Sequence, residues 1–232
     1  MEPIAHIRSP FAEKFGVPRQ GNLAPHVVGE IVFEPPYRNP ECVRGLERFS
    51  HLWLIWGFHR NGEEWHPTVR PPRLGGNTRL GVFATRSPFR PNGLGLSAVR
   101  LLSVEQGPVL RVSGADLVDG TPIYDSKPYI PYADSIPDAA EGFTATPWEP
   151  LQVQLPPAMP PQATPAWVQA VREVLSQDPR PAYQEDPERE YHLVLLPFEI
   201  TFKVQGGTAV VTRIAPSRQA RQPLPNPNPN PN

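Results

Sequence analysis

His51-Leu-Trp-Leu-Ile-Trp-Gly-Phe58 contains the longest apolar run of the chain, Leu52 to Phe58. This run is far shorter than the roughly 20 residues that a membrane-spanning helix needs. Its β-branched and aromatic residues favour a strand, and apolar residues point to both of its faces. A strand of this kind is buried on both sides. We therefore expect one face to line the core of a β-domain and the other face to be covered by a further surface, which a partner subunit could supply.

The flanking sequence predicts more strands of the same domain. Short stretches rich in Val, Ile, Leu and aromatic residues alternate with Gly, Pro and Asn, a pattern typical of an all-β domain. The 34 prolines among 232 residues indicate turns and extended connections. One short helix is expected over 39–49. The strand candidates besides His51–Phe58 are Ile4–Arg8, Val27–Phe33, Arg79–Ala84, Leu94–Leu102, Val109–Leu117 and Pro122–Asp125.

The C-terminal part predicts a smaller α+β unit. Thr164 caps a helix that has Pro165 at its first position and runs to about Gln177. Two strands, Tyr191–Val204 and Thr208–Ile214, follow, and Gly206-Gly207 between them permits a tight hairpin. The expected domains are a β-domain over 1–137, a Pro-rich connection over 138–163, the α+β domain over 164–216 and a disordered Asn-Pro tail over 217–232.

Charge is distributed unevenly along the chain. The formal net charge is only −1, which neither favours nor excludes a nucleic-acid partner, because phosphate is bound by local patches. The segment from His66 to Val104 contains six arginines and no Asp or Glu. These arginines are Arg70, Arg73, Arg79, Arg86, Arg90 and Arg100.

The sequence disfavours a disulfide, a metal site, the common catalytic and nucleotide-binding motifs, and a membrane or secreted location. Cys42 is the only cysteine, so an intramolecular disulfide and a cysteine-rich metal site are excluded. No pair among the six histidines has the spacing of a helical zinc motif, so we expect no metal. A serine nucleophile elbow, a P-loop and a dinucleotide-binding fingerprint are also missing. The start of the chain carries no signal segment, and we expect a cytoplasmic protein without a membrane span.

Two dense polar segments remain as candidates for chemistry. Thr85–Gly93 places Arg86 and Arg90 on a loop stiffened by two prolines, where they either bind a carboxylate or phosphate or are solvated charges of a surface turn. In the second segment, Asp125 and Lys127 share one face of a strand. The two side chains either only hold each other ionised or form a polar site with Tyr129.

These segments resemble signature strings of a known family. Phe83-Ala-Thr-Arg-Ser-Pro-Phe-Arg-Pro-Asn92, Asp116-Leu-Val-Asp-Gly-Thr-Pro122 and Asp125-Ser-Lys-Pro-Tyr129 are similar to those of the TsaA-like tRNA methyltransferases. Earlier strings match in the same order, and 172–183 resembles the C-terminal domain of the bacterial members, so the resemblance extends to about Ile214. The earlier strings are Ile7-Arg-Ser-Pro10, Val17-Pro-Arg-Gln20, Arg44-Gly-Leu-Glu47 and Ser50-His-Leu-Trp53.

The resemblance implies a fold and an activity. The fold would be mainly β, a small antiparallel β-barrel with a smaller α+β domain, acting as a homodimer with the cofactor S-adenosyl-L-methionine bound on the barrel near the subunit contact. The reaction would be methylation of N6 of N6-threonylcarbamoyladenosine at position 37, with the tRNA anticodon arm as partner. The implied cofactor-binding residues are Pro18, Arg19, Gln20, His59, Arg60, Arg86, Leu96, Val118, Asp119, Gly120 and Thr121.

The implied reaction requires a base, because the acceptor nitrogen belongs to a urea-like group and is a poor nucleophile while it keeps its proton. Our hypothesis is that Asp125, oriented by Lys127 and Tyr129, accepts this proton. For RNA binding we expect phosphate contacts from Arg70, Arg73, Arg79 and Arg90. Two alternatives stay open: a cofactor-sensing or RNA-binding module without turnover, and a methyltransferase acting on another substrate.

Overall fold

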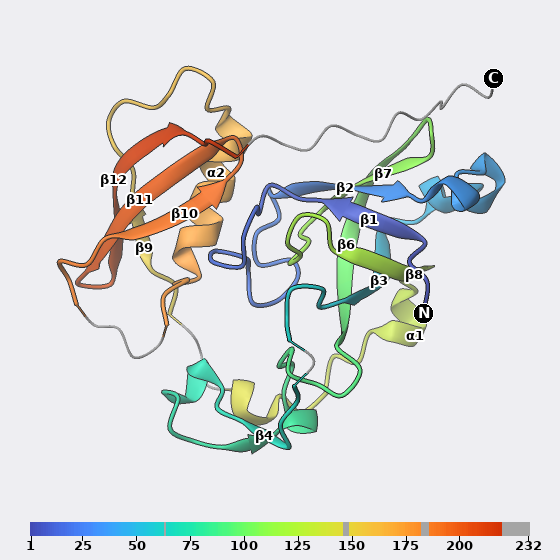
Figure 1. Ribbon diagram of the computed structural model, residues 1–232, viewed down its shortest axis with the longest axis horizontal. Helices are drawn as coiled ribbons and strands as arrows, with labels where there is room; N and C mark the ends of the chain where they lie inside the picture. Colours follow the sequence, from blue (N-terminus) through green and yellow to red (C-terminus); the bar gives the residue numbers. More distant parts are fainter. Residues whose placement is uncertain (63, 146–148, 182–185, 220–232) are drawn as a thin grey trace.

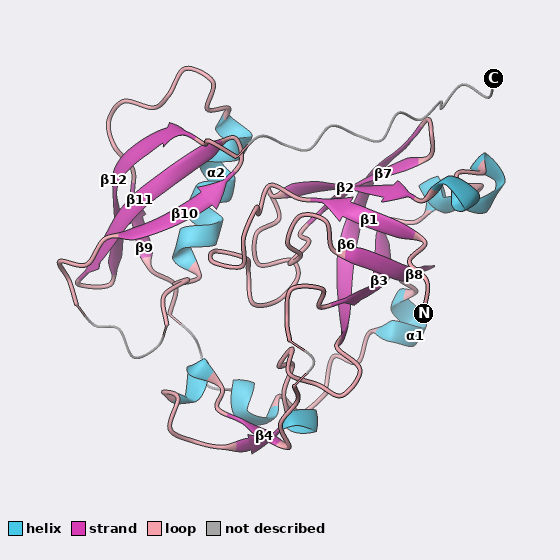
Figure 2. Ribbon diagram, in the orientation of Figure 1, coloured by secondary structure: helices cyan, strands magenta, loops and turns pink. Residues whose placement is uncertain are grey.

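The computed structural model of the chain describes residues 1–62, 64–145, 149–181 and 186–219. It contains a closed six-stranded β-barrel and a separate four-stranded sheet that is accompanied by a helix (Figures 1 and 2). The expected fold class, mainly β with a small antiparallel barrel and a smaller α+β unit, is therefore confirmed. None of the described helices is long and apolar enough to cross a membrane.

The barrel closes in the order β1-β2-β7-β6-β3-β8, and every neighbouring pair is antiparallel. This order differs from the order along the chain, so residues distant in sequence become neighbours. The strands are β1 (Ala5–Arg8), β2 (Val28–Phe33), β3 (His51–Gly57), β6 (Leu94–Glu105), β7 (Val109–Ser113) and β8 (Pro122–Pro128).

Alternation along the strands builds the barrel core. In β3, Leu52, Leu54 and Trp56 are buried inside, and their burial contributes about 1.5–3 kcal/mol for each fully buried side chain. Trp53 and Ile55 lie on the outer wall and are only partly buried. A single copy of the chain thus leaves part of the outer face of β3 uncovered.

The antiparallel arrangement gathers three connections at one end of the barrel. Strands β1, β3 and β7 end there, and β2, β6 and β8 begin there. The segments that join them at this end are 9–27, 58–93 and 114–121. We call them the first, second and third end loops.

Two predicted elements of this domain are wrong. Of Arg79–Ala84, only Leu80–Gly81 forms a strand, β5, and it pairs with β4 (Thr68–Val69) outside the barrel, because a closed barrel has no free edge to extend. The helix expected over 39–49 consists of two 3₁₀ turns, because Gly45 adopts φ 86° between them. The short helical elements are η1 (Pro35–Tyr37), η2 (Pro40–Val43), η3 (Leu46–Arg48), η4 (Pro72–Leu74), η5 (Val82–Ala84), α1 (Pro131–Asp134) and η6 (Gly142–Thr144).

The C-terminal unit is a sheet of order β10-β11-β12-β9 with helix α2 (Pro165–Ser176). The expected cap is present, since Thr164 Oγ1 accepts a hydrogen bond from the Trp167 amide at 3.2 Å. The expected hairpin is also present, with φ of 52° and 75° at Gly206 and Gly207. The strands are β9 (Gln152–Gln154), β10 (Tyr191–Leu195), β11 (Phe198–Gln205) and β12 (Thr208–Pro216).

Two details of this unit differ from the sequence reading. The single strand expected over Tyr191–Val204 is wrong, because the chain turns at Leu196-Pro197 and β10 pairs back onto β11. Strand β9 lies inside the segment expected to be a connection, and it pairs in parallel with β12. Most of the expected Asn-Pro tail, residues 220–232, lies outside the described residues.

The C-terminal unit packs against the first end loop. Phe11, Ala24 and Val27 of this loop belong to the same apolar cluster as the buried residues of α2 and of the C-terminal sheet. At Gly16, an added Cβ would lie 1.9 Å from Leu193 Cδ1, so only glycine permits this close approach. The end of the barrel that carries the three end loops therefore also carries the C-terminal unit (Figure 1).

Candidate active site

The three end loops contain all but one of the expected cofactor-binding residues. Pro18, Arg19 and Gln20 lie in the first loop, His59, Arg60 and Arg86 in the second, and Val118 to Thr121 in the third. Leu96 is the exception, since it is the third residue of β6 on the barrel wall. Barrel topology thus brings three separated sequence segments to one place.

Arg86 and Gln20 connect the second and first end loops. Arg86 Nη1 donates a hydrogen bond to Gln20 Oε1 at 2.5 Å. Gln20 is uncharged, and no ion pair of Arg86 occurs among the described residues. The exposed guanidinium therefore keeps donors and a full positive charge for an external carboxylate or phosphate.

Arg60 connects all three end loops. Its Nη1 donates to the carbonyl oxygen of Ala12 at 2.7 Å, and its Nη2 donates to that of Asp119 at 3.2 Å. The Asp119 carboxylate in turn accepts a hydrogen bond from the Ser9 amide at 2.9 Å. Gly120 has φ 77°, a conformation that favours glycine. Its amide donates to the carbonyl oxygen of Ile7 at 2.9 Å, which holds the third end loop against β1.

His59 lies beside this linkage, next to Arg60. Its pKa is lowered mainly by desolvation, and then by the positive charges of Arg60, His6 and Lys14. A neutral imidazole can accept a hydrogen bond, and Arg60 Nε approaches His59 Nε2 at 3.3 Å. Near it, Asn61 Nδ2 is buried and has no hydrogen-bond partner among the described residues, although Asn61 Oδ1 accepts from Lys14 Nζ at 2.6 Å. An unsatisfied buried donor of this kind suits a polar ligand.

Two of the three expected catalytic residues, Asp125 and Lys127, lie on β8, and Tyr129 directly follows its last residue. The register places Asp125 opposite Ile55 of β3, and Ile55 is opposite Leu96 of β6, so these three residues form one row across the wall. Lys127 Nζ lies 3.0 Å from Asp125 Oδ2. The register shifts next to Asp125, and such bulges often re-aim a side chain near a functional site.

Tyr129 is placed differently from the expectation. Its ring packs against Trp53 and His51, at centroid distances of 5.4 and 6.3 Å. No hydrogen bond joins Tyr129 to Asp125 or Lys127 among the described residues. The structure thus brings Asp125 and Lys127 together and leaves Tyr129 just beyond the end of their strand.

The sequence reading missed a buried polar chain beneath the first end loop. Trp56 Nε1 donates to Ser97 Oγ at 3.0 Å, and Ser97 Oγ donates to Asp116 Oδ1 at 2.6 Å. Burial raises the pKa of Asp116, against a smaller lowering by the Ser97 hydrogen bond. Asp116 opens the Asp-Leu-Val-Asp-Gly-Thr-Pro string, which was the available signal, but only the fold shows that it is partly buried and bonded to Ser97.

The expected RNA-binding arginines fall into two groups. Arg70, Arg73 and Arg79 are exposed around the β4–β5 hairpin, with Arg73 Nη2 also donating to the Thr144 carbonyl at 3.0 Å. Arg90 instead donates from Nη1 to the carbonyls of Val82 and Thr85 at 3.1 and 2.8 Å, so it shapes its own loop. Its guanidinium carbon also lies 5.6 Å from the centre of the Phe83 ring.

Comparison with known proteins matches the chain to one family in both parts. The model described as the tRNA-methyltransferase O N-terminal domain matches residues 6–135, and the TrmO C-terminal domain matches residues 149–217. The chain belongs to the TrmO family.

Named relatives and solved structures of the TrmO family cover nearly the whole chain. The tRNA (adenine(37)-N6)-methyltransferase of Escherichia coli K12 is 45% identical over 216 residues, which are 88% of this chain and 92% of that protein. A putative S-adenosylmethionine-dependent methyltransferase of Pseudomonas aeruginosa is 45% identical over 210 residues, covering 86% and 90%. The crystal structure of TrmO from Pseudomonas aeruginosa superposes with a TM-score of 0.77 at 36% identity and covers 92% of this chain and 96% of that one.

The polar groups of this TrmO-family site are suited to an organic ligand. Among the described residues, no group of three or more His, Cys, Asp or Glu side chains could hold a metal ion. The end loops offer an exposed cation at Arg86, an imidazole at His59 whose lowered pKa favours the accepting form, and a donor at Asn61 without a partner among the described residues. S-adenosyl-L-methionine carries a carboxylate, a ribose and an adenine that match such groups.

Proposed function

We propose that the chain is an S-adenosyl-L-methionine-dependent methyltransferase that methylates N6 of adenosine 37 in tRNA, with N6-threonylcarbamoyladenosine as the substrate nucleoside. The observation that carries the proposal is the convergence of the end loops, with the Arg86–Gln20 and Arg60–Asp119 bonds, at one end of a TrmO-family barrel. The names of the Escherichia coli and Pseudomonas aeruginosa relatives support the cofactor and the acceptor.

The end loops would hold the cofactor, which when bound supplies an electrophilic methyl group on its sulfonium. Arg86, supported by Gln20, would bind the methionine carboxylate. The turn around Gly120, fixed by Arg60, would offer backbone groups at close approach. His59 and Asn61 would meet polar atoms of the nucleoside part. Leu96 would give an apolar contact from the wall.

Asp125 would act as the proton acceptor. As the methyl group bonds to N6 of the acceptor, the proton on this nitrogen must leave, and a carboxylate within reach assists that step. Asp125 shares the cross-strand row with Leu96, so the residue lies on the wall that borders the cofactor loops. Lys127 Nζ, 3.0 Å from Asp125 Oδ2, would orient the carboxylate, and Tyr129 would contribute from the position directly after the strand.

The exposed arginines would bind the anticodon arm. Arg70, Arg73 and Arg79 surround a hairpin outside the barrel and are suited to phosphate contacts. The target base must be splayed out of its stack to reach the site. Arg90 would act indirectly, because it holds the loop that carries Arg86.

A second copy of the chain would cover the outer wall. Leu96 is 58% exposed, and the partly buried Ile55 and Trp53 lie beside it on β3. Covering these apolar side chains in a homodimer would bury them and place a subunit contact next to Asp125. The proposed location of this homodimer is the cytoplasm, where tRNA is modified.

The test is transfer of labelled methyl from S-adenosyl-L-methionine to purified tRNA with and without the threonylcarbamoyl modification, followed by nucleoside mass spectrometry. Methylation of only the modified tRNA is the expected result. Methylation of unmodified tRNA would contradict the proposed nucleoside. Tight cofactor binding without methylation of either tRNA would contradict the enzyme assignment and favour a module without turnover.

A further inference from the structure

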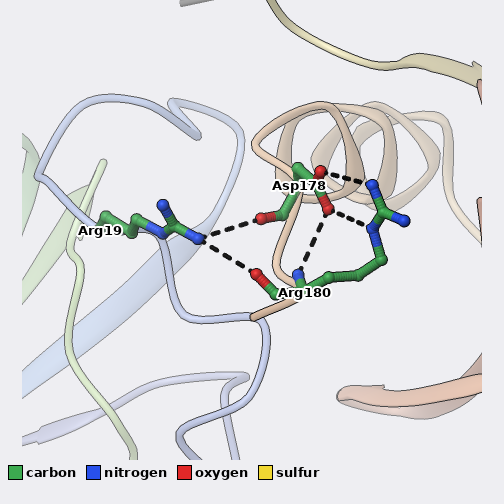
Figure 3. Close-up of polar contacts among 3 residues, drawn as sticks. All are labelled: Arg19, Asp178 and Arg180. Atoms are coloured by element: carbon green, nitrogen blue, oxygen red, sulfur yellow. Dashed lines mark hydrogen bonds and ion pairs between the residues drawn. The ribbon is translucent and has the colours of Figure 1, made fainter. Parts of the chain in front are cut away.

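Arg19 is directed to the C-terminal unit, although the next residue, Gln20, binds Arg86 in the candidate cofactor site. Arg19 Nη2 donates to the carbonyl oxygen of Asp178 at 3.4 Å and to that of Arg180 at 3.2 Å (Figure 3). Both acceptors are backbone atoms of the turn that follows α2. The Arg19 guanidinium therefore links the first end loop to the C-terminal unit.

The turn at 178–180 is itself rigidly built. Arg180 Nε and Nη2 donate to the two carboxylate oxygens of Asp178, each at 2.8 Å, and the Arg180 amide donates to Oδ1 at 3.4 Å. The pair is mostly buried, with side-chain exposures of 15% and 27%. Asp178 has φ 46°, a left-handed conformation that the carboxylate contacts help to hold. The two-pronged pair thus aims two carbonyl oxygens at Arg19.

Phe15 and Val17, which precede Arg19 in the first end loop, also contact the C-terminal unit. The Phe15 ring stacks on Tyr191 and Phe202 at centroid distances of 6.4 and 6.5 Å. Val17 packs against the same apolar cluster. Residues 15, 17 and 19 are therefore held by one unit, while Gln20, directly after them, contacts a residue of the barrel domain.

We propose that the 178–180 turn positions the first end loop through Arg19, so that the C-terminal unit sets the affinity of the barrel for its cofactor. Asp178, Arg180 and the Arg19 side chain are positioning residues, which act by placing Gln20 and its partner Arg86. The Arg19 guanidinium then affects cofactor binding by fixing the position of the first end loop. The identity of the cofactor in this inference rests on the proposed function.

The experiment compares Arg19→Ala and Arg180→Ala with the parent in the full-length chain. Calorimetry is expected to show that each variant raises the Kd for S-adenosyl-L-methionine about tenfold, the size of a hydrogen bond made by a charged group. Turnover of Arg180→Ala at saturating cofactor is expected to stay within about twofold, because Arg180 lies outside the cofactor-binding residues and the reacting groups are untouched. The double variant should bind no more weakly than about the weaker single variant, since both changes break one linkage.

A matched control lies in the same contact between the two units. Glu173 on α2 accepts from the His26 amide at 2.9 Å and pairs with His26 Nδ1 at 2.5 Å. Glu173→Ala is expected to lower the melting temperature while changing the cofactor Kd less than about twofold, because His26 lies near the end of the first end loop, six residues after Gln20. An equal rise in Kd for Glu173→Ala and Arg180→Ala would overturn the proposal, as would an unchanged Kd in both arginine variants.

A second readout needs no cofactor. Amide hydrogen exchange of Val17 and of residues 19–21 in the ligand-free chain is expected to accelerate about tenfold in Arg180→Ala and to stay at the parent rate in Glu173→Ala. Parental exchange in Arg180→Ala would contradict the positioning role. Failure of the parent chain to methylate tRNA would instead contradict the proposed function, and the exchange result would still decide this inference.

Discussion

Asp125→Asn separates a catalytic from a structural role of the carboxylate on β8. The substitution removes the charge and keeps the shape, and the amide oxygen can still accept from the Ser126 amide. The ion pair with Lys127 is exposed, at 45% for Asp125 and 65% for Lys127. Exposed pairs contribute about 0–1 kcal/mol, so the melting temperature should fall by no more than about 2–4 °C in a chain of this length.

The expected catalytic effect is much larger. A positioned general base contributes about 10²- to 10⁴-fold to rate, which corresponds to about 3–5 kcal/mol of activation free energy. If Asp125 accepts the N6 proton, turnover of Asp125→Asn should fall by that factor while folding stability hardly changes. The two roles therefore differ by a factor that a simple assay resolves.

The assay is single-turnover methyl transfer at saturating enzyme and cofactor, with a melting curve for each variant. Lys127→Met serves as the control, because it breaks the same 3.0 Å pair and leaves the carboxylate in place. We expect Lys127→Met to retain much more turnover than Asp125→Asn. Wild-type turnover in Asp125→Asn would refute the reasoning, and equal losses in the two variants would assign the effect to the pair.

Three further predictions concern stability and RNA binding. Burial raises the pKa of Asp116 in the folded chain above 3.8, the value expected in the unfolded chain. The contribution of this group to the free energy of unfolding is therefore fully present below pH 3.8 and is lost as pH rises through the folded-state pKa. Asp116→Asn should therefore gain stability over the parent between pH 4 and 7 in urea unfolding, and a constant difference across this range would contradict the burial. Gly95→Ala would place a Cβ 2.3 Å from the Trp56 ring and should lower the free energy of unfolding by about 1–3 kcal/mol. The control is Gly81→Ala, whose Cβ would meet nothing within 4 Å. Equal unfolding midpoints for the two variants would disprove the clash. Arg79→Ala should weaken tRNA binding and reduce the slope of log affinity against log salt concentration by about 0.7–0.9, and an unchanged slope would remove this phosphate contact.

Local patterns were sufficient for the six barrel strands, for helix α2 and for the C-terminal hairpin. Alternation predicted the strands around Ile7, Ile31 and Leu54, because an inward residue at every second position is a property of the strand itself. The cap at Thr164 and the glycine pair at 206–207 predicted a helix start and a hairpin for the same reason: their geometry depends on neighbours in sequence. The signature strings around Arg86 and Asp125 indicated the family and its chemistry.

Tertiary structure alone decided which segments meet. Alternation reports which face of a strand is buried but not which strand lies beside it, so the barrel order β1-β2-β7-β6-β3-β8 was beyond local reasoning. Closure of that order joins Gln20 to Arg86 across 66 positions and Arg60 to Asp119 across 59. Packing of a second unit then joins Arg19 to the Asp178 carbonyl across 159 positions. The sequence therefore indicated which residues form the site, while closure of the barrel and packing of the C-terminal unit decided which of them contact each other.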